Sequence, residues 1–225
     1  MKQITNIPIK IDKDELLKIL KIKKESAGKI NQNLAKLIDE EIVRGMKLAR
    51  PIALYEFKKV INSDGDGVEI EGGIKIGENT FKNYMTSIDQ LGFALVTIGP
   101  AIEEEIDKLQ KDGEYTRAMI LDAVGSVAVE DAAGNLNHMI CDELKGKKTG
   151  ISRRFSPGYG KFKVKEQKKI SDIIPFEKLG VALTSSFMMV PQKSISFCLY
   201  TGKLKKEIPG TCNICGMKDC PYRSC

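Results

Sequence analysis

The chain has 225 residues, of which 42% are hydrophobic and 29% are charged, and its formal net charge is +6. This composition is typical of a folded globular protein and excludes a disordered or collagen-like chain. No apolar run approaches the roughly 18 residues of a membrane-spanning helix, and no nucleic-acid recognition motif occurs, so we expect neither a membrane nor a nucleic-acid partner.

The N-terminal segment is predicted to contain one strand and two helices. Residues 4–10 have the composition of a short strand, and the acidic residues that follow suit the start of a helix over 12–22. Apolar residues recur at helical spacing over 26–49, and Pro51 ends that helix. Because the segment has no uninterrupted apolar signal-peptide core, we expect a cytoplasmic protein.

The next segment is predicted to mix strands with a helix. Residues 52–60 and 67–76 alternate in polarity as strands do, and the turn signal at 62–67 separates them. Residues 79–88 are predicted to form a helix, and the apolar run at 92–99 has the length of a strand.

Two further helices and three short elements complete the predicted order. Pro100 opens a helix over 100–112, and a long helix rich in small residues covers 115–145. A short helix and turn are expected at 170–180, followed by two strands, 181–191 and 194–202, that pair with each other.

This order lacks a regular alternation of strand and helix, and neither a Gly-x-Gly-x-x-Gly nor a Walker motif occurs. It predicts an α+β fold with a twisted, largely antiparallel sheet flanked by helices. We divide the chain into an N-terminal extension (1–75), a core (76–204) and a cysteine-rich tail (205–225).

The stretch "RRFSPGYG" (153–160) is a candidate binding loop. The guanidinium of an arginine matches a carboxylate, Pro157-Gly158 is a turn signal that allows close backbone approach, and Tyr159 offers a ring and a hydroxyl. Two interpretations remain open from these residues: a surface turn with a stacked tyrosine, or a loop that holds a small zwitterion.

A polar stripe on the long helix is a candidate partner of this loop. Asp122, Ser126 and Glu130 are four residues apart on a helix of otherwise small and apolar residues. The stripe is either a plain solvent-facing surface or a set of carboxylates directed at a cation. His138 is the sole histidine and therefore has no partner for a triad or metal site.

Three segments resemble the activation domain of cobalamin-dependent methionine synthase. Arg154 to Tyr159 is similar to the family's Arg-x-x-x-Gly-Tyr motif, and Leu179 to Ser196 is similar to its segment G-x-x-L-T-E-S-x-A-M-x-P-x-x-S-V-S. Ala118 to Glu130 resembles the family helix that carries a ligand-contacting glutamate. The segments occur in the family's order, over roughly residues 80–202.

The resemblance implies a binding site for S-adenosylmethionine. In the family, the motif arginine binds the ligand's carboxylate, which implies that role for Arg154, and the turn Pro157-Gly158-Tyr159 contacts the ligand. Glu130 would face the ligand's amino group or sulfonium end. Two positions depart from the family pattern, because Lys148 and Ser185 stand where the family has acidic residues.

The resemblance also implies a function in repair. The chain is expected to act as a stand-alone subunit for reductive reactivation of a cobalamin-dependent methyltransferase, with the cobalamin carried by a corrinoid-binding partner and with flavodoxin or ferredoxin as electron donor. No catalytic side chain is assigned, because the cofactor carries the reaction. Lys148 and Ser185 favour an alternative, a non-catalytic docking module for a corrinoid protein. A third hypothesis is an iron–sulfur reductase of another corrinoid protein.

The tail contains four cysteines that could bind a metal, namely Cys212, Cys215, Cys220 and Cys225. Four thiolates within such a short window can ligate a 4Fe-4S cluster or zinc. The compact spacing, with proline after Cys220, favours the cluster. If the tail holds a cluster, it could deliver an electron to the cobalt. The other two cysteines, Cys141 and Cys198, lie in apolar segments and are predicted to be buried thiols.

Overall fold

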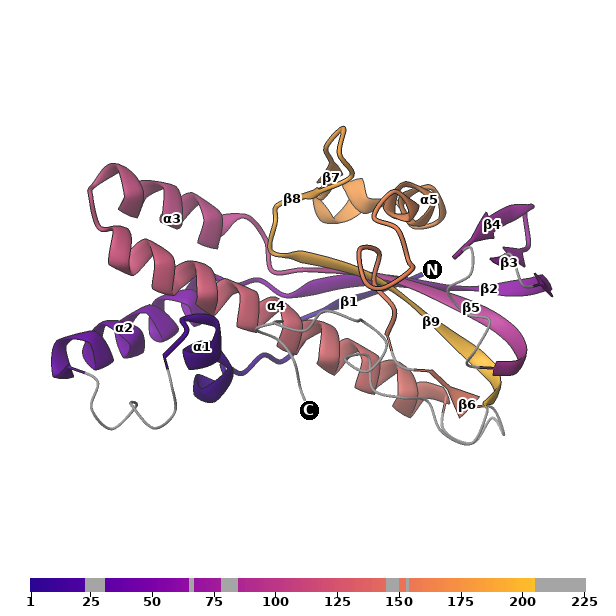
Figure 1. The fold of residues 1–225 in the computed structure, drawn as a ribbon, viewed down its shortest axis with the longest axis horizontal. Helices are drawn as coiled ribbons and strands as arrows, with labels where there is room; N and C mark the ends of the chain where they lie inside the picture. The colour runs from indigo at the N-terminus through magenta and orange to yellow at the C-terminus, as the bar shows by residue number, and fades with distance from the viewer. Residues whose placement is uncertain (23–30, 65–66, 78–84, 145–149, 153, 205–225) are drawn as a thin grey trace.

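The computed structural model describes residues 1–22, 31–64, 67–77, 85–144, 150–152 and 154–204. These residues form an α+β fold in which an antiparallel sheet carries helices on both faces (Figure 1). The predicted fold class is therefore confirmed. Within the described ranges, no helix is long and apolar enough to cross a membrane.

The sheet is built around three long strands, β2, β5 and β9, that lie side by side. β2 pairs with β5 along eight residues, and β5 pairs with β9 over its whole length. β1 and β3 pair with β2, while β6 pairs with β9 and β4 with β3. The strands of this sheet in the described chain are β1 (Lys2–Thr5), β2 (Ile52–Asp64), β3 (Gly67–Ile70), β4 (Ile74–Ile76), β5 (Met85–Thr97), β6 (Gly150–Ile151) and β9 (Ser194–Leu204).

The helices begin and end where the sequence supplies caps. The Asp12 side chain accepts hydrogen bonds from the first backbone N–H groups of α1, and the Asn31 side chain does the same for α2. Pro100 precedes α3, where a missing N–H costs nothing. The helices are α1 (Lys13–Ile19), α2 (Gln32–Leu48), α3 (Ala101–Lys111), α4 (Tyr115–Leu144), α5 (Glu166–Ile173) and the 3-10 helix Phe176–Leu179.

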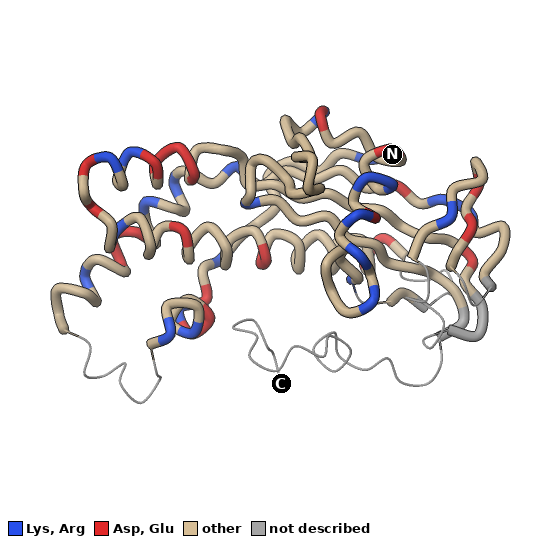
Figure 2. Tube along the Cα trace, turned by 45° about the horizontal axis from the view of Figure 1, so that its top comes forward, with Lys and Arg blue, Asp and Glu red and all other residues tan. Residues whose placement is uncertain are grey.

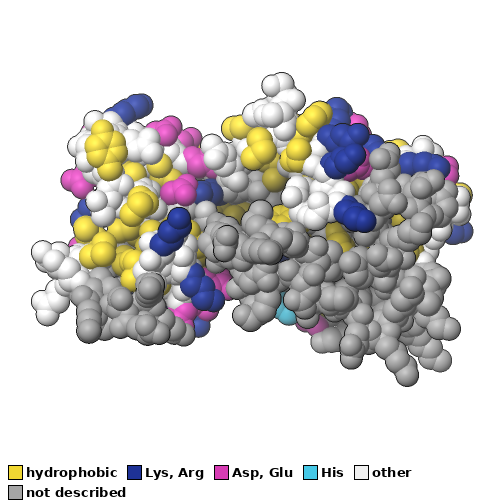
Figure 3. Space-filling view, viewed as in Figure 1, with side chains coloured by type: hydrophobic (Ala, Val, Ile, Leu, Met, Phe, Trp, Pro, Cys, Tyr) yellow, Lys and Arg dark blue, Asp and Glu magenta, His cyan; other side chains and the backbone are white. Residues whose placement is uncertain are grey.

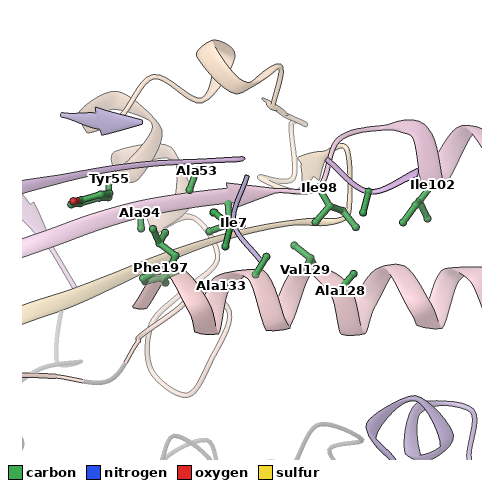
Figure 4. Packing of buried hydrophobic residues seen from close by; sticks show 14 of the residues in the cluster. Ile7, Ala53, Tyr55, Ala94, Ile98, Ile102, Ala128, Val129, Ala133 and Phe197 are labelled. Carbon is green, nitrogen blue, oxygen red and sulfur yellow. The ribbon is translucent and has the colours of Figure 1, made fainter. Parts of the chain in front are cut away.

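One face of the sheet packs against α4. Successive residues of a strand point to opposite faces, so the cross-strand pair Ala94 and Phe197 lies on this face. Figure 4 shows Ala94 and Phe197 on the side of the strands that faces α4, with Ala133 the nearest of the labelled helix residues and Val129 and Ala128 farther along the helix. Small helix residues allow the helix to approach the strands closely, which explains why α4 is rich in alanine.

The opposite face packs against α5 and the 3-10 helix. The next pair along the same strands, Phe93 and Cys198, lies on this second face together with Phe162, Ile170 and Phe176. All five side chains are buried. The sheet therefore separates two apolar cores, and a residue's position in β9 decides which core it joins.

A third core joins the N-terminal helices to α4 on its side away from the sheet. Leu16 of α1 and Ile38 of α2 are fully buried against Val124. Arg117 of α4 donates to Glu41 of α2 at 2.6 Å, which compensates the charge of this buried carboxylate. The N-terminal helices are thus packed on the same helix that covers the sheet (Figure 1).

Two predictions for segments that contribute to the sheet are wrong, one for a strand and one for a helix. The strand predicted at 4–10 ends at Thr5, because Asn6 adopts a φ of 57° and the chain then crosses α4, where Asn135 Nδ2 donates to the carbonyl of Pro8 at 2.8 Å. The helix predicted at 79–88 is replaced at its described end by β5, because pairing with β9 overrides the local preference.

Two further predictions fail in strand pairing. The segment 67–76 forms two strands, β3 and β4, joined by a turn at Gly72 and Gly73, which both have positive φ. The segment 181–191 does not pair with 194–202. It folds on itself as the hairpin of β7 (Ala182–Leu183) and β8 (Met189–Val190), while β9 pairs with β5.

The division of the chain into 1–75, 76–204 and 205–225 stays a prediction. β2 from the first segment is paired with β5 from the second, so both contribute to one sheet. The third segment lies outside the described residues.

Candidate functional site

The polar stripe of α4 lies along a helix whose other faces are buried. Asp122 is exposed, and Ser126 and Glu130 are half-buried. Ser126 Oγ donates to the backbone carbonyl of Asp122 at 3.1 Å, so the first two residues also contact each other along the helix. Each of the two carboxylates in the stripe forms an ion pair with a cation from another part of the chain. The stripe is therefore not a plain solvent-facing surface.

The segment 150–155 brings an arginine to this stripe. After β6, Ser152 N donates to the carbonyl of Tyr200 at 2.9 Å, and Phe155 and Cys198 exchange two backbone hydrogen bonds at 2.8 and 2.7 Å. The segment therefore runs beside β9. Phe155 is buried on the second face, where its ring stacks on Tyr200 with centroids 5.3 Å apart. Its neighbour Arg154 is directed to the other face, which α4 covers.

Arg154 and Glu130 form an ion pair at this place. Arg154 Nη2 lies 3.2 Å from Glu130 Oε2, and the two side chains are 27% and 35% exposed. The guanidinium carbon of Arg154 also lies 5.6 Å from the ring centroid of Phe197. Both side chains of the pair are therefore partly exposed, and the ring of Phe197 lies beside the guanidinium.

The turn that contains Pro157, Gly158 and Tyr159 follows directly. Gly158 has a φ of 96°, a conformation that glycine adopts without strain, and its N–H donates to the carbonyl of Phe162 at 2.7 Å. Phe162 is buried and fixes the turn to the second face. Tyr159 is 42% exposed. The structure brings Arg154 and Glu130 into contact and places these three residues in the adjoining turn.

Lys193 is a residue of this region that sequence reasoning missed. Its Nζ lies 2.6 Å from Asp122 Oδ1 and 3.0 Å from Ser126 Oγ, and the side chain is 10% exposed. The aliphatic stem passes over Gly125, where an added Cβ would lie 3.1 Å from Lys193 Cε. One signal could have revealed it, because Lys193 is the single charged residue between Val181 and Gly202.

The backbone of Lys193 makes further bonds. Its N–H donates to Glu103 Oε1 of α3 at 2.7 Å, and its carbonyl accepts from the N–H of Ile98 at 3.2 Å. One residue therefore links α3, α4 and the end of β5. It lies just before β9 and just after the hairpin of β7 and β8, and so fixes where that hairpin leaves the sheet.

The hairpin carries one of the two departures from the family pattern. Ser185 is exposed near its tip, where Thr184 and Ser186 hydroxyls lie 3.1 Å apart. Met188 and Val190 are also exposed on this hairpin. The other departure, Lys148, lies outside the described residues.

The cysteines fall into two groups. Cys198 is fully buried, and burial, with a smaller effect of the Glu166 carboxylate, raises the pKa of its thiol well above the usual range. Cys141 is only half-buried, which corrects the prediction that both are buried. Cys212, Cys215, Cys220 and Cys225 lie outside the described residues. Within the described part of the chain, no group of three or more His, Cys, Asp or Glu side chains could hold a metal ion.

Comparison with known proteins identifies the family and the fold. The family described as "Vitamin B12 dependent methionine synthase, activation domain" matches residues 80–207, which is more than half of the chain. No curated protein sequence matches the chain. Among solved structures, the crystal structure of the MetH reactivation domain bound to AdoHcy is similar, with a TM-score of 0.63 and 18% sequence identity. The match covers 84% of this chain and 70% of that one.

Proposed function

Because the chain belongs to the activation-domain family of vitamin B12-dependent methionine synthase, we propose that it binds S-adenosylmethionine and serves the reductive reactivation of a cobalamin-dependent methyltransferase. The observation that carries this proposal is the contact between Arg154 and Glu130, two opposite charges held at the surface of α4. A solved structure of similar fold is described as bound to AdoHcy, the product that remains when S-adenosylmethionine gives up its methyl group.

The two charges fit the amino-acid end of such a ligand. A guanidinium binds a carboxylate through two parallel hydrogen bonds, and a carboxylate binds an ammonium group. The ligand's carboxylate would contact Arg154 and its amino group or sulfonium would face Glu130. In this arrangement the ligand enters between the two side chains, and each exchanges one opposite charge for another, so no half-buried charge is left without a partner.

The neighbouring turn would hold the rest of the ligand. Tyr159 is partly exposed, and Gly158 has no side chain that would block a ligand from the backbone. Pro157 restricts the backbone at the start of the turn. These three residues, with Arg154 and Glu130, are the proposed ligand site.

The chemistry is supplied by the ligand and by the cobalamin of a partner protein. When bound to the partner, cob(II)alamin would be reduced by one electron from a donor, for which we propose flavodoxin or ferredoxin, and the reduced cobalt would accept the methyl group of the sulfonium, leaving AdoHcy. The chain itself binds and orients the ligand, and we assign no proton transfer or nucleophile to it. It would act as a subunit beside a corrinoid-binding methyltransferase.

A spectroscopic assay tests the function. A corrinoid methyltransferase without an activation domain of its own is poised as cob(II)alamin, and the chain, S-adenosylmethionine and a reductant are added. We expect the cob(II)alamin absorbance to be replaced by that of methylcobalamin. Arg154→Gln should slow this conversion, whereas Arg50→Gln, an exposed arginine far along the chain from the site, should not. Conversion that proceeds equally well without S-adenosylmethionine would contradict the proposal.

A further inference from the structure

A strongly basic segment follows the proposed ligand site. Residues 161–169, "KFKVKEQKK", contain five lysines and one glutamate, so their net charge is five minus one, or +4. We call these residues the basic segment. Its sole acid, Glu166, is buried, and it contacts Lys169 of the same segment. The positive charge of the other lysines is therefore not balanced from within.

Three lysines of the basic segment are exposed at the surface. Lys161, Lys163 and Lys165 are exposed and form no ion pair with any residue that the structure describes. Lys168, by contrast, is paired with Asp172 of α5. Lys18, Lys47 and Lys111 also form no ion pair within the described residues, but they lie on three different helices, whereas Lys161, Lys163 and Lys165 stand at every second position of one short segment.

Two buried side chains anchor the basic segment to the protein. Phe162 is buried in the second core, and Glu166 Oε2 accepts from the N–H of Gly77 at 3.2 Å. Lys161 directly precedes Phe162, and Lys163 and Lys165 lie between Phe162 and Glu166. The backbone that carries these lysines is therefore fixed, and less conformational entropy is lost when they meet a partner than in a flexible tail.

The basic segment lies next to the proposed ligand site. Gly158 N donates to the carbonyl of Phe162, so the turn with Tyr159 and the start of the basic segment form one unit. Figure 2 shows Lys and Arg positions concentrated in this loop and the adjoining α5, and Figure 3 shows basic side chains gathered on the same part of the surface. Tyr159 and Val164 add exposed apolar surface beside the cations.

We propose that the basic segment is a docking site for an acidic surface on a partner protein. The inference rests on the proposed function, which requires a second protein to approach the ligand site from outside. Exposed cations around a small apolar patch suit a transient protein contact, because long-range attraction raises the association rate and the apolar residues bury surface. A nucleic acid is the less suitable partner, since three free lysines would neutralise only about three phosphates.

A binding measurement with a defined probe tests this inference. Fluorescence anisotropy of a labelled polyglutamate peptide is followed as the full chain is added, at low and at physiological salt. We expect binding that weakens as salt increases. The triple variant Lys161→Gln, Lys163→Gln, Lys165→Gln should bind the peptide about tenfold more weakly.

The matched control is the triple variant Lys18→Gln, Lys47→Gln, Lys111→Gln. These three lysines are also exposed and lie near the ends of α1, α2 and α3, so the control has the same net charge as the first variant. Its peptide affinity should stay within about twofold of wild type. Equal weakening in both variants would overturn the inference, because binding would then follow net charge alone.

Two further arms separate the remaining outcomes. A single-stranded oligonucleotide of equal charge that binds more tightly than the peptide, and loses this binding in the first variant, would overturn the assignment to a protein partner. Calorimetric titration of the same samples with S-adenosylmethionine reports on the ligand site. Failure of the ligand to bind wild type would count against the proposed function. Equal weakening of peptide binding in the two triple variants, with ligand binding intact, would count against the role of the basic segment alone.

Discussion

Lys193 connects three elements of the fold, namely α3, α4 and the end of β5. Its ammonium is held by Asp122 and Ser126, and its backbone by Glu103 and Ile98. The two members of its ion pair are in unlike surroundings, because the lysine side chain is 10% exposed and the Asp122 side chain is 58% exposed. Removal of one partner therefore has a different cost from removal of the other.

This asymmetry gives a stability prediction at the scale of one residue. Asp122→Asn leaves a buried ammonium without its counter-charge and should lower the free energy of unfolding by about 1–2 kcal/mol. Lys193→Met leaves an exposed carboxylate that water can solvate and keeps most of the aliphatic packing, so it should cost less than about 1 kcal/mol. Urea unfolding of both variants measures the difference. A larger loss for Lys193→Met than for Asp122→Asn would contradict this explanation.

Cys198 gives a prediction on pH. Burial and the Glu166 carboxylate raise its pKa in the folded state, so the native thiol keeps its proton at a pH where the unfolded thiol loses it. The stabilising contribution is therefore fully present below the unfolded pKa of about 8.5 and is lost as the pH rises, by at most about 1.4 kcal/mol per pH unit. Urea unfolding from pH 8 to about 10 should show this decrease in wild type.

The control for this prediction is Cys198→Ala. The variant lacks the thiol and should show a weaker decrease in stability over the same pH range, although its stability is lower throughout because a small cavity is left. Parallel curves for the two proteins would show that Cys198 does not contribute to the pH dependence.

At the scale of elements, α4 contacts one face of the sheet and the helices α1, α2 and α3. It packs on the sheet, on α1 and α2, and on α3, and it carries the polar stripe on its remaining face. Glycine allows the closest of these contacts. At Gly45 of α2, an added Cβ would lie 2.4 Å from Val124 Cγ1 of α4, whereas at Gly134 of α4 nothing lies within 4 Å of such an atom.

Two glycine substitutions should therefore have opposite effects. Gly45→Ala should lower the free energy of unfolding by about 1–3 kcal/mol, because the clash outweighs the gain in helix propensity. Gly134→Ala should raise it by up to about 1 kcal/mol, because only the propensity changes. Val124→Ala in combination with Gly45→Ala should recover part of the loss. Thermal unfolding compares them, and a stabilising Gly45→Ala would refute the proposed contact.

The elements that could be predicted from sequence are those with a strong local signal. The helix α2 follows from apolar spacing, α1 and α3 from the acidic residues and the proline at their starts, and α4 from its long run of small residues. The errors occur where distant pairing decides the structure. The described end of 79–88 became strand because β9 lies beside it, and the segment 181–191 formed its own hairpin because β5 already occupied one edge of β9. No local pattern contains that information.

The candidate site was predictable only in part, for the same reason. The chemistry of Arg154 and Glu130 could be inferred from residue types, motif and resemblance, and the structure brings the two side chains together. Lys193 was missed because its role depends on a helix about seventy residues earlier in the chain, although its isolation in an apolar segment was visible in the sequence.

At the scale of the whole molecule, the proposed ligand site and the basic segment are carried by consecutive residues that leave the edge of the sheet at β9. The short segment 150–155 runs along β9 and sends Phe155 into one core and Arg154 toward α4. The turn with Tyr159 and the basic segment then follow without a break. A ligand site and a partner surface would thus be joined by one rigid stretch of backbone, which suits a subunit that must hold a small molecule against another protein.

The central claim is that S-adenosylmethionine binds with its carboxylate on Arg154 and its cationic end toward Glu130. Calorimetric titration of wild type and Arg154→Gln with S-adenosylmethionine and with its decarboxylated analogue tests it most directly. Loss of the arginine and loss of the carboxylate should each weaken binding by about tenfold or more, and the two losses together should cost little more than either alone. If the losses multiply, or if Arg154→Gln binds S-adenosylmethionine as tightly as wild type does, the ligand's carboxylate does not meet Arg154 and the proposed site is wrong.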